Sequence, residues 1–304
     1  MKKLMLIVNP TSGRQLLRSS LFDIIEALSL SGYEVTVFPT QRRGHATDLA
    51  LASGAYDLLV CCGGDGTLNE VISGLMGLTH RPALGYIPAG TTNDLAVTLG
   101  LPRDPVLAVH AIVEGAPLLY DIGAFEERYF AYVAAFGAFT GVSYSTPQPL
   151  KNSFGHVAYI LEGIRSLPEV RACRLRITHD GIICTSQYIF GAVTNSTSVA
   201  GLFRLREDAV HLSDGLFEVM LVKKPQNLAE LNRIITGLYT QRYDAAYVSF
   251  FHTSALTVEC LDGPMSWSLD GEDSEARHMV HIKNMRGAIT FRTPSREMDV
   301  IGEM

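Results

Sequence analysis

Short apolar runs alternate with helical patterns over the first 120 or so residues, and this alternation limits the fold more than any other feature. Residues 4–8 are apolar without interruption, as a strand covered on both faces of a parallel sheet requires. Repeated strand–helix units predict an open parallel sheet with helices on both faces. The expected strands are 4–8, 33–38, 57–62 and 83–87, and the expected helices are 17–28, 46–52, 68–78 and 105–114.

The rhythm changes near residue 125, where alternating strand patterns replace the strand–helix units. We therefore expect an α/β domain over 1–125 and a mainly antiparallel β domain over 126–304, whose final segment is able to pack back on the first. The expected strands of the second half are 128–136, a hairpin of 174–178 and 184–190 around 179–181, 217–222, 256–259, and a final hairpin of 278–283 and 288–292; helices are expected at 153–166 and 228–238.

Charge and cysteine usage exclude several classes of protein. The chain carries 25 Lys and Arg against 31 Asp and Glu, a net charge of −6, so no nucleic acid partner is expected. Five cysteines without a C-x-x-C pair indicate a reducing compartment and no disulfide framework. No stretch approaches about 18 uninterrupted apolar residues, so no transmembrane segment is expected. These features predict a cytoplasmic protein.

Polar, glycine-bearing loops follow the strands of the first half. They span residues 9–13, 39–46, 63–67 and 88–94. In an open α/β sheet, ligands bind outside the carboxyl ends of the strands, where such loops gather. The sequence therefore predicts one ligand site at this edge of the sheet.

The loop Gly63-Gly64-Asp65-Gly66-Thr67 carries the most chemical information. Its glycines allow close backbone approach, and the helix that follows directs free N–H groups at the same place, which suits a phosphate. No lysine follows the glycines, so this is not a Walker A loop. A carboxylate beside phosphate needs a cation between them, so Asp65 predicts Mg²⁺. The alternative is a tight turn in which Asp65 only caps the helix.

Two Asp-Gly pairs stand out in the second half. In Leu269-Asp270-Gly271-Glu272, the Asp-Gly pair is ordinary hairpin chemistry, and Glu272 just beyond it could act as a general base. Asp214-Gly215 also reads as a turn. No histidines or cysteines have zinc-like spacing, and no G-x-S-x-G supports a serine hydrolase.

Taken together, four motifs resemble the diacylglycerol kinase catalytic-domain family, and within it the soluble bacterial lipid kinases. They are N-P-T-S-G at 9–13, G-G-D-G-T-L-N-E at 63–70, P-A-G-T-T-N-D-L-A at 88–96 and L-D-G-E at 269–272. The resemblance implies a three-layer α/β N-terminal domain with an open parallel sheet, a C-terminal β-sandwich domain, and ATP in a ligand cleft between them.

The resemblance also implies roles for individual residues. Glu272 would accept a proton, and Asp121 would join the Mg²⁺ network. A structural Mg²⁺ would be held by the Asp214 carboxylate and by the main-chain carbonyls of His211 and Leu216. The implied nucleotide contacts are Asn9, Thr40 (in a T-x-x-x-G-x-A pattern), Gly64, Asp65, Gly66, Thr67, Leu68, Asn69, Glu70 and Thr91.

The function expected from these features is an ATP- and Mg²⁺-dependent kinase of a lipid hydroxyl, with diacylglycerol as the first candidate. A reversed assignment, with Asp65 as the base and Glu272 as a positioning group, stays open. The alternatives are a kinase of a soluble acceptor such as NAD, and a non-catalytic nucleotide-binding regulator. The regulator is disfavoured because four acidic candidates, Asp65, Asp94, Asp121 and Glu272, are all present. A lipid acceptor requires peripheral contact with a membrane, and a homodimer is left open.

Overall fold

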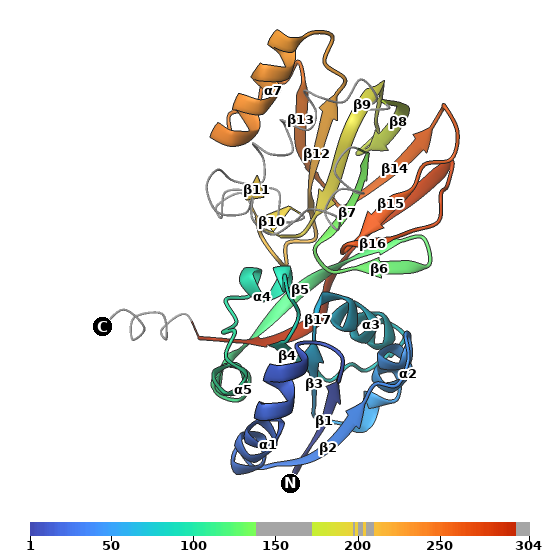
Figure 1. Cartoon of the computed structure of the whole chain (residues 1–304). Coiled ribbons are helices and arrows are strands. Elements are labelled where there is room, and N and C mark those ends of the chain that lie inside the picture. Colours follow the sequence, from blue (N-terminus) through green and yellow to red (C-terminus); the bar gives the residue numbers. More distant parts are fainter. Residues whose placement is uncertain (138–171, 197, 200–202, 205–209, 296–304) are drawn as a thin grey trace. The chain divides into compact units, whose positions relative to one another are not determined.

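The computed structural model describes residues 1–137, 172–196, 198–199, 203–204 and 210–295. The chain divides into two compact units, one formed by Met1–Asp121 with Gly287–Met304 and one formed by Ile122–Arg286 (Figure 1). Among the described residues, no helix is both long enough and apolar enough to span a bilayer. The helix expected at 153–166 lies outside the described residues.

The first unit is built on the predicted parallel sheet. Its strands lie in the order β2 (Tyr33–Pro39), β1 (Lys2–Val8), β3 (Leu58–Gly63) and β4 (Ala83–Pro88), all parallel. The register pairs Val8 with both Pro39 and Cys62, and Cys62 with Ile87. The carboxyl ends of the strands therefore meet at one edge of the sheet, as the sequence predicts.

Two pairs of helices cover this sheet (Figure 1). The helices α1 (Arg14–Leu30) and α5 (Pro105–Glu114) pack together, and their buried residues join one face of β1 and β3 in a single core. The helices α2 (His45–Leu51) and α3 (Asp65–Met76) pack together, and the alternate residues Met5, Ile7 and Leu59 are buried on the other face. The remaining elements of this part are a short helical turn, η1 (Ser53–Ala55), the helix α4 (Asp94–Thr98) and the strand β5 (Ala116–Phe125).

The helix α3 begins three residues earlier than the periodicity predicts. Gly64 precedes it in an extended conformation, and the N–H of Leu68 donates to the carbonyl of Gly64 at 3.0 Å. This bond closes the first turn around Asp65, Gly66 and Thr67. Because Gly and Thr are poor helix formers, the periodicity of apolar residues gives no sign of this turn.

The second unit is antiparallel β structure with one described helix, α7 (Leu228–Thr240). The predicted hairpin turn at 179–181 is confirmed, since β8 and β9 are joined through Asp180 and Gly181 with φ of 46° and 76°. The strands are β6 (Arg128–Phe130), β7 (Val133–Gly137), β8 (Cys173–His179), β9 (Ile182–Thr194), β10 (Ser198–Val199), β11 (Phe203–Arg204), β12 (Phe217–Lys223), β13 (Val248–Thr253), β14 (Ala255–Cys260), β15 (Trp267–Leu269) and β16 (Glu272–Asp273).

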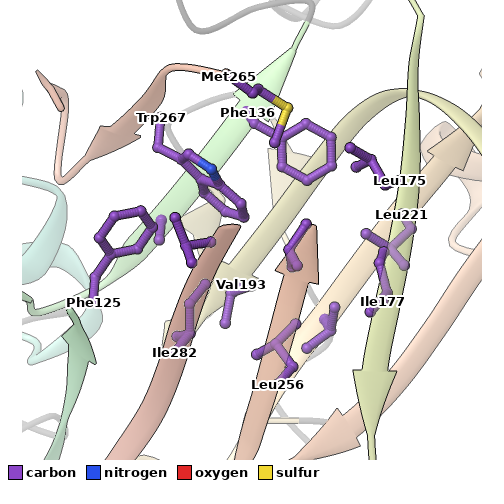
Figure 2. Packing of buried hydrophobic residues seen from close by; sticks show 14 of the residues in the cluster. Phe125, Phe136, Leu175, Ile177, Val193, Leu221, Leu256, Met265, Trp267 and Ile282 are labelled. Carbon is purple, nitrogen blue, oxygen red and sulfur yellow. The ribbon is translucent and has the colours of Figure 1, made fainter. Parts of the chain in front are cut away.

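One hydrophobic cluster fills the second unit, and Figure 2 shows its side chains pointing toward one another from different strands. Trp267 lies among them, with its ring centroid 5.3 Å from that of Phe125 and 4.9 Å from that of Phe136. Edge-on aromatic pairs of this kind stabilise a core beyond the area they bury. The strand β15 is therefore anchored firmly through Trp267.

Two sequence predictions about strands are wrong. The expected strand 128–136 is broken at Ala131 and Tyr132 into β6 and β7. The expected final hairpin is instead one strand, β17 (Met279–Thr293), which runs antiparallel to β14 and then parallel to β4. Gly287 within it has φ of 56°, and its N–H donates to Oδ1 of Asp121 at 2.6 Å. The Asp121 carboxylate thus stabilises an extended conformation in a segment whose sequence resembles a turn.

Candidate active site

The loops after β1, β3 and β4 pack backbone against backbone. A Cβ on Gly90 would lie 2.7 Å from the Cα of Gly64, and a Cβ on Gly13 would lie 2.6 Å from the carbonyl oxygen of Ala89. Real Cβ atoms do not approach so closely, so only glycine allows these contacts. Gly13 also has φ of 51°, which glycine adopts without strain. The glycines therefore bring the three loops together.

Asn9 ties the first of these loops to α3. Its Nδ2 donates to Oγ1 of Thr67 at 2.8 Å, and its Oδ1 accepts the N–H and the O–H of Thr11 at 3.0 and 2.7 Å. The N–H of Thr40, after β2, donates to the carbonyl of Val8 at 2.8 Å. Two residues expected to contact the nucleotide thus lie at the same edge of the sheet.

Asp65 is the first residue of α3, and its carboxylate is directed at another helix. Oδ2 accepts the N–H of Asn93 at 2.8 Å, at the entrance to α4, while Oδ1 is buried without a hydrogen-bond partner. Burial raises the pKa of the Asp65 carboxyl above its ordinary value, and backbone N–H groups of Asn93, Asp94 and Leu95 offset part of that shift. Since Gly64 is the residue that caps α3, Asp65 does not cap its own helix.

Asn93 holds the loop after β4 in shape. It is buried with φ of 53°, and its Oδ1 accepts the N–H of Gly90 at 2.8 Å and the O–H of Tyr86 at 3.2 Å. Its Nδ2 donates back to the carbonyl of Gly90 at 2.8 Å. The structural role of Asn93 was not predicted from the sequence. The signals that could have indicated it are the tolerance of asparagine for positive φ and its tendency to hydrogen-bond to nearby backbone.

Glu70 connects α3 to the loop after β2. Its carboxylate accepts the N–H groups of Gly44 and Ala46 at 2.8 and 3.2 Å, and its carbonyl accepts the O–H of Thr47 at 3.0 Å. Glu70 therefore fixes the segment that begins with Thr40.

The remaining expected nucleotide contacts lie in or beside these loops. Gly66 and Thr67 lie in the first turn of α3, whose N-terminus has no side-chain cap. Leu68 is buried at 2% exposure, so its side chain belongs to the core. Asn69 follows it in α3, and Thr91 is exposed in the loop after β4. Their contacts with a nucleotide stay predictions.

Glu272 follows a two-residue turn in the second unit. Asp270 and Gly271 have φ of 48° and 85°, the conformation of a tight hairpin, and Leu269 of β15 pairs with Glu272 of β16. The Glu272 side chain is 36% exposed, with Oε2 4.0 Å from Nη2 of Arg128. The Glu272 carboxylate is therefore partly accessible to solvent and lies near a guanidinium group.

Asp270 is the residue of this motif that sequence analysis undervalued. Its side chain is buried and accepts the N–H groups of Ala131, Tyr132 and Val133 at 2.6, 3.0 and 3.0 Å. Because these N–H groups donate to Asp270, they are not available for hydrogen bonds to a neighbouring strand, which explains the break between β6 and β7. The partners are about 138 residues apart in sequence, so no local pattern indicates them.

The Asp214 segment forms a turn. Oδ1 of Asp214 accepts the N–H of Leu216 at 2.8 Å, and Gly215 has φ of 89°. His211 and Leu216 are exposed. Within the described residues, no cluster of three or more His, Cys, Asp or Glu side chains could hold a metal. A site made of one carboxylate and two main-chain carbonyls is of another kind, and it stays a prediction.

Asp94 and Asp121 differ in their surroundings. Asp94 is the first residue of α4, and its N–H is among those that face the Asp65 carboxylate. Asp121 is fully buried and accepts the Gly287 N–H. Asp94 thus lies beside Asp65, whereas the observed contact of Asp121 holds β17.

This chain is similar to known proteins over most of its length. The family model described as the diacylglycerol kinase catalytic domain matches residues 3–125. A diacylglycerol kinase of Bacillus subtilis (strain 168) is 37% identical over 293 residues, covering 93% of this chain and 96% of the relative. A diacylglycerol kinase of Staphylococcus saprophyticus is 41% identical over 237 residues, covering 77% of each chain.

Solved structures agree in fold. A crystal structure of a diacylglycerol kinase from Bacillus anthracis str. Sterne has a TM-score of 0.75 at 22% identity, and a second crystal structure from the same organism has a TM-score of 0.81 at 24% identity. Both cover 96% of this chain and 97% of the other. At these identities the likeness shows the fold alone. The near full-length match to the Bacillus subtilis relative shows more. The chain belongs to the diacylglycerol kinase family.

Proposed function

We propose that this lipid kinase transfers the terminal phosphoryl group of ATP to the hydroxyl of diacylglycerol and requires Mg²⁺. The observation that carries the proposal is the Asp65 carboxylate, which has a buried, unpartnered Oδ1 at the start of α3, among glycine loops that pack backbone to backbone. A phosphate-binding loop has little use for a carboxylate unless a cation accompanies the phosphate.

The glycine loops supply the binding of phosphate in this proposal. The uncapped N-terminus of α3 presents backbone N–H groups and the positive end of the helix dipole. Gly64 and Gly66 lack side chains that would keep a phosphate at a distance. Asn9, Asn93 and Glu70 hold the loops through hydrogen bonds, so the site is formed before the nucleotide binds.

The donor set around Asp65 fits a magnesium ion. An unpartnered carboxylate oxygen is a ligand that Mg²⁺ prefers, and Asp94 begins the helix that the same carboxylate faces. Mg²⁺ bound there would offset negative charge on the transferred phosphoryl group. Asp65 and Asp94 are the residues we expect to hold it.

Glu272 is the proposed general base. Phosphoryl transfer relies mainly on positioning and charge neutralisation, and a base near the acceptor hydroxyl removes its proton. The carboxylate of Glu272 is accessible, and Arg128 lies 4.0 Å from it. Contact with a membrane surface, where such an acceptor resides, is part of the same proposal.

Incubation of the purified chain with radiolabelled ATP, Mg²⁺ and micelles containing diacylglycerol tests this function. We expect label in the organic phase that depends on both the lipid and Mg²⁺. A parallel reaction with NAD and no lipid should stay unlabelled. Label found only on NAD would show a kinase of a soluble acceptor, and no label in either reaction would favour a regulator; both results contradict the proposal.

The proposed structural Mg²⁺ at Asp214 has its own test. Asp214→Asn keeps the oxygen that accepts the Leu216 N–H but removes the charge that a cation needs. We expect Mg²⁺ to raise the melting temperature of the parent protein, by mass action on the folded state, and not that of the variant. Both proteins, the one with Asp214 and the one with Asp214→Asn, also carry Asp65→Asn and are melted without ATP, so that only the Asp214 site contributes to the Mg²⁺ shift. An unchanged Mg²⁺ shift would leave Asp214 as a turn residue.

A further inference from the structure

We propose that Asp270 is a positioning residue for Glu272: its buried carboxylate fixes the turn from which Glu272 projects. The inference rests on the proposed function, in which Glu272 is the base. The sequence indicates only that Asp270 belongs to a hairpin turn. In the structure its side chain also binds three backbone N–H groups.

The Asp270 carboxylate accepts hydrogen bonds from three neighbouring residues of the chain. Three consecutive backbone N–H groups, those of Ala131, Tyr132 and Val133, donate to its two carboxylate oxygens. Its own N–H donates to the carbonyl of Val133 at 2.9 Å. Consecutive N–H groups of this kind make a concave anion-binding site. Here the anion is a side chain of the same unit, held at 5% exposure.

The turn itself does not require this charge. Asn-Gly and Asp-Gly both favour the two-residue hairpin conformation, and asparagine tolerates positive φ as aspartate does. Burying a carboxylate is unfavourable unless it is well hydrogen-bonded. An amide would offer one acceptor oxygen and would place an NH₂ donor against backbone N–H groups. Holding three N–H groups therefore needs Asp270 in particular.

The fixed turn restrains Glu272 from both sides. On one side, β15 pairs with β7 from Trp267↔Phe136 to Leu269↔Ala134, and Trp267 is packed in the core (Figure 2). On the other side, Arg128 of β6 lies 4.0 Å from Oε2 of Glu272 and donates to the carbonyl of Asp273 at 3.2 Å. The Asp270 carboxylate binds the chain between β6 and β7. Loss of its three contacts would let Glu272 and Arg128 move relative to each other.

A double-mutant cycle distinguishes positioning from general stability. Asp270→Asn should lower kcat about 10²-fold, the scale expected for a misplaced catalytic group, with the KM for ATP nearly unchanged. In a Glu272→Gln background the same change should lower kcat by less than about threefold, because no base is left to position. Asp262→Asn is the matched control: its Oδ2 accepts the Arg174 N–H at 2.6 Å in the same unit, and kcat should not change.

Fluorescence checks the fold of each variant. Trp267 is the single tryptophan of the chain and lies three residues before Asp270. Its emission should keep the parent wavelength in Asp270→Asn, since the core around it is intact. If the emission instead shifts toward that of exposed tryptophan, Asp270→Glu replaces it in the cycle, because glutamate keeps the charge but moves the turn.

The outcomes separate this inference from the proposed function. If each single variant lowers kcat and the two fold-changes multiply in the double variant, the positioning role is overturned and the proposed function is not affected. An Asp270 variant with parent kcat overturns it too. A parent protein that phosphorylates no lipid overturns the proposed function, and this inference with it.

Discussion

Replacing Asp65 by asparagine should lower kcat by about 10³-fold or more without unfolding the protein. Loss of a metal-positioning carboxylate removes several kcal/mol of transition-state stabilisation, about 1.4 kcal/mol for each factor of ten. Asparagine keeps an oxygen for the Asn93 N–H, now 2.8 Å from Oδ2, so the loop contact survives. What disappears is the anionic, unpartnered oxygen. The measurement is steady-state lipid phosphorylation at saturating ATP and Mg²⁺.

The same variant should be more stable than the parent at neutral pH in the absence of Mg²⁺. Burial raises the pKa of Asp65 in the folded protein, so the folded state holds that proton more tightly than the unfolded chain does. The stabilisation from protonation is complete below the unfolded pKa and is lost as pH rises through the folded pKa. Asparagine suffers no such loss. The melting temperature of the variant should therefore exceed that of the parent increasingly as pH rises from acid to neutral.

Asp104→Ala is the control for this pair of measurements. Oδ1 of Asp104 caps α5, accepting the N–H groups of Val106 and Leu107, each at 3.0 Å. Its loss should cost about 1 kcal/mol of stability and leave kcat unchanged. An Asp65→Asn enzyme that turns over within about threefold of the parent would remove Asp65 from the mechanism. A variant less stable than the parent at neutral pH would contradict the assignment of burial as the dominant influence.

The part of the site that could be predicted depends on local chemistry. Glycine loops after apolar strands identify the ligand edge because parallel strands end together and glycine allows close approach. The register of Val8, Cys62 and Ile87 confirms that edge. The contact between Asp65 and Asn93 joins two loops that were each visible in sequence, although they are 28 residues apart.

The part that could not be predicted depends on partners far away in the chain. The segment 128–136 has the composition of one strand, and the break arises only because a carboxylate about 138 residues later takes its N–H groups. The segment 284–287 has the composition of a turn, yet Asp121, 166 residues earlier, accepts the Gly287 N–H and β17 continues. Intrinsic propensity describes the conformation that a segment prefers by itself. In these two segments, hydrogen bonds to distant buried carboxylates override that preference.

Replacing Glu272 by glutamine should lower kcat by about 10²- to 10⁴-fold, the usual contribution of a general base. Glutamine keeps the size of the side chain and one oxygen for the nearby Arg128, but it cannot take a proton near neutral pH. ATP affinity should hardly change, because the proposed task of Glu272 concerns the acceptor hydroxyl. The KM for ATP and the rate at saturating lipid, measured together, separate these effects.

The pH profile decides between the two assignments of the base. If Glu272 is the base, the profile of kcat/KM for the lipid should lose its acidic limb in Glu272→Gln, because that limb reports protonation of the group. If Asp65 is the base and Glu272 only positions the acceptor, the limb should persist while kcat falls. A structural turn residue would leave both the rate and the profile unchanged. If the kcat of Glu272→Gln stays within about threefold of the parent value, the base must be sought at Asp65, Asp94 or Asp121. The proposed mechanism would then be wrong, although the lipid kinase assignment would stand.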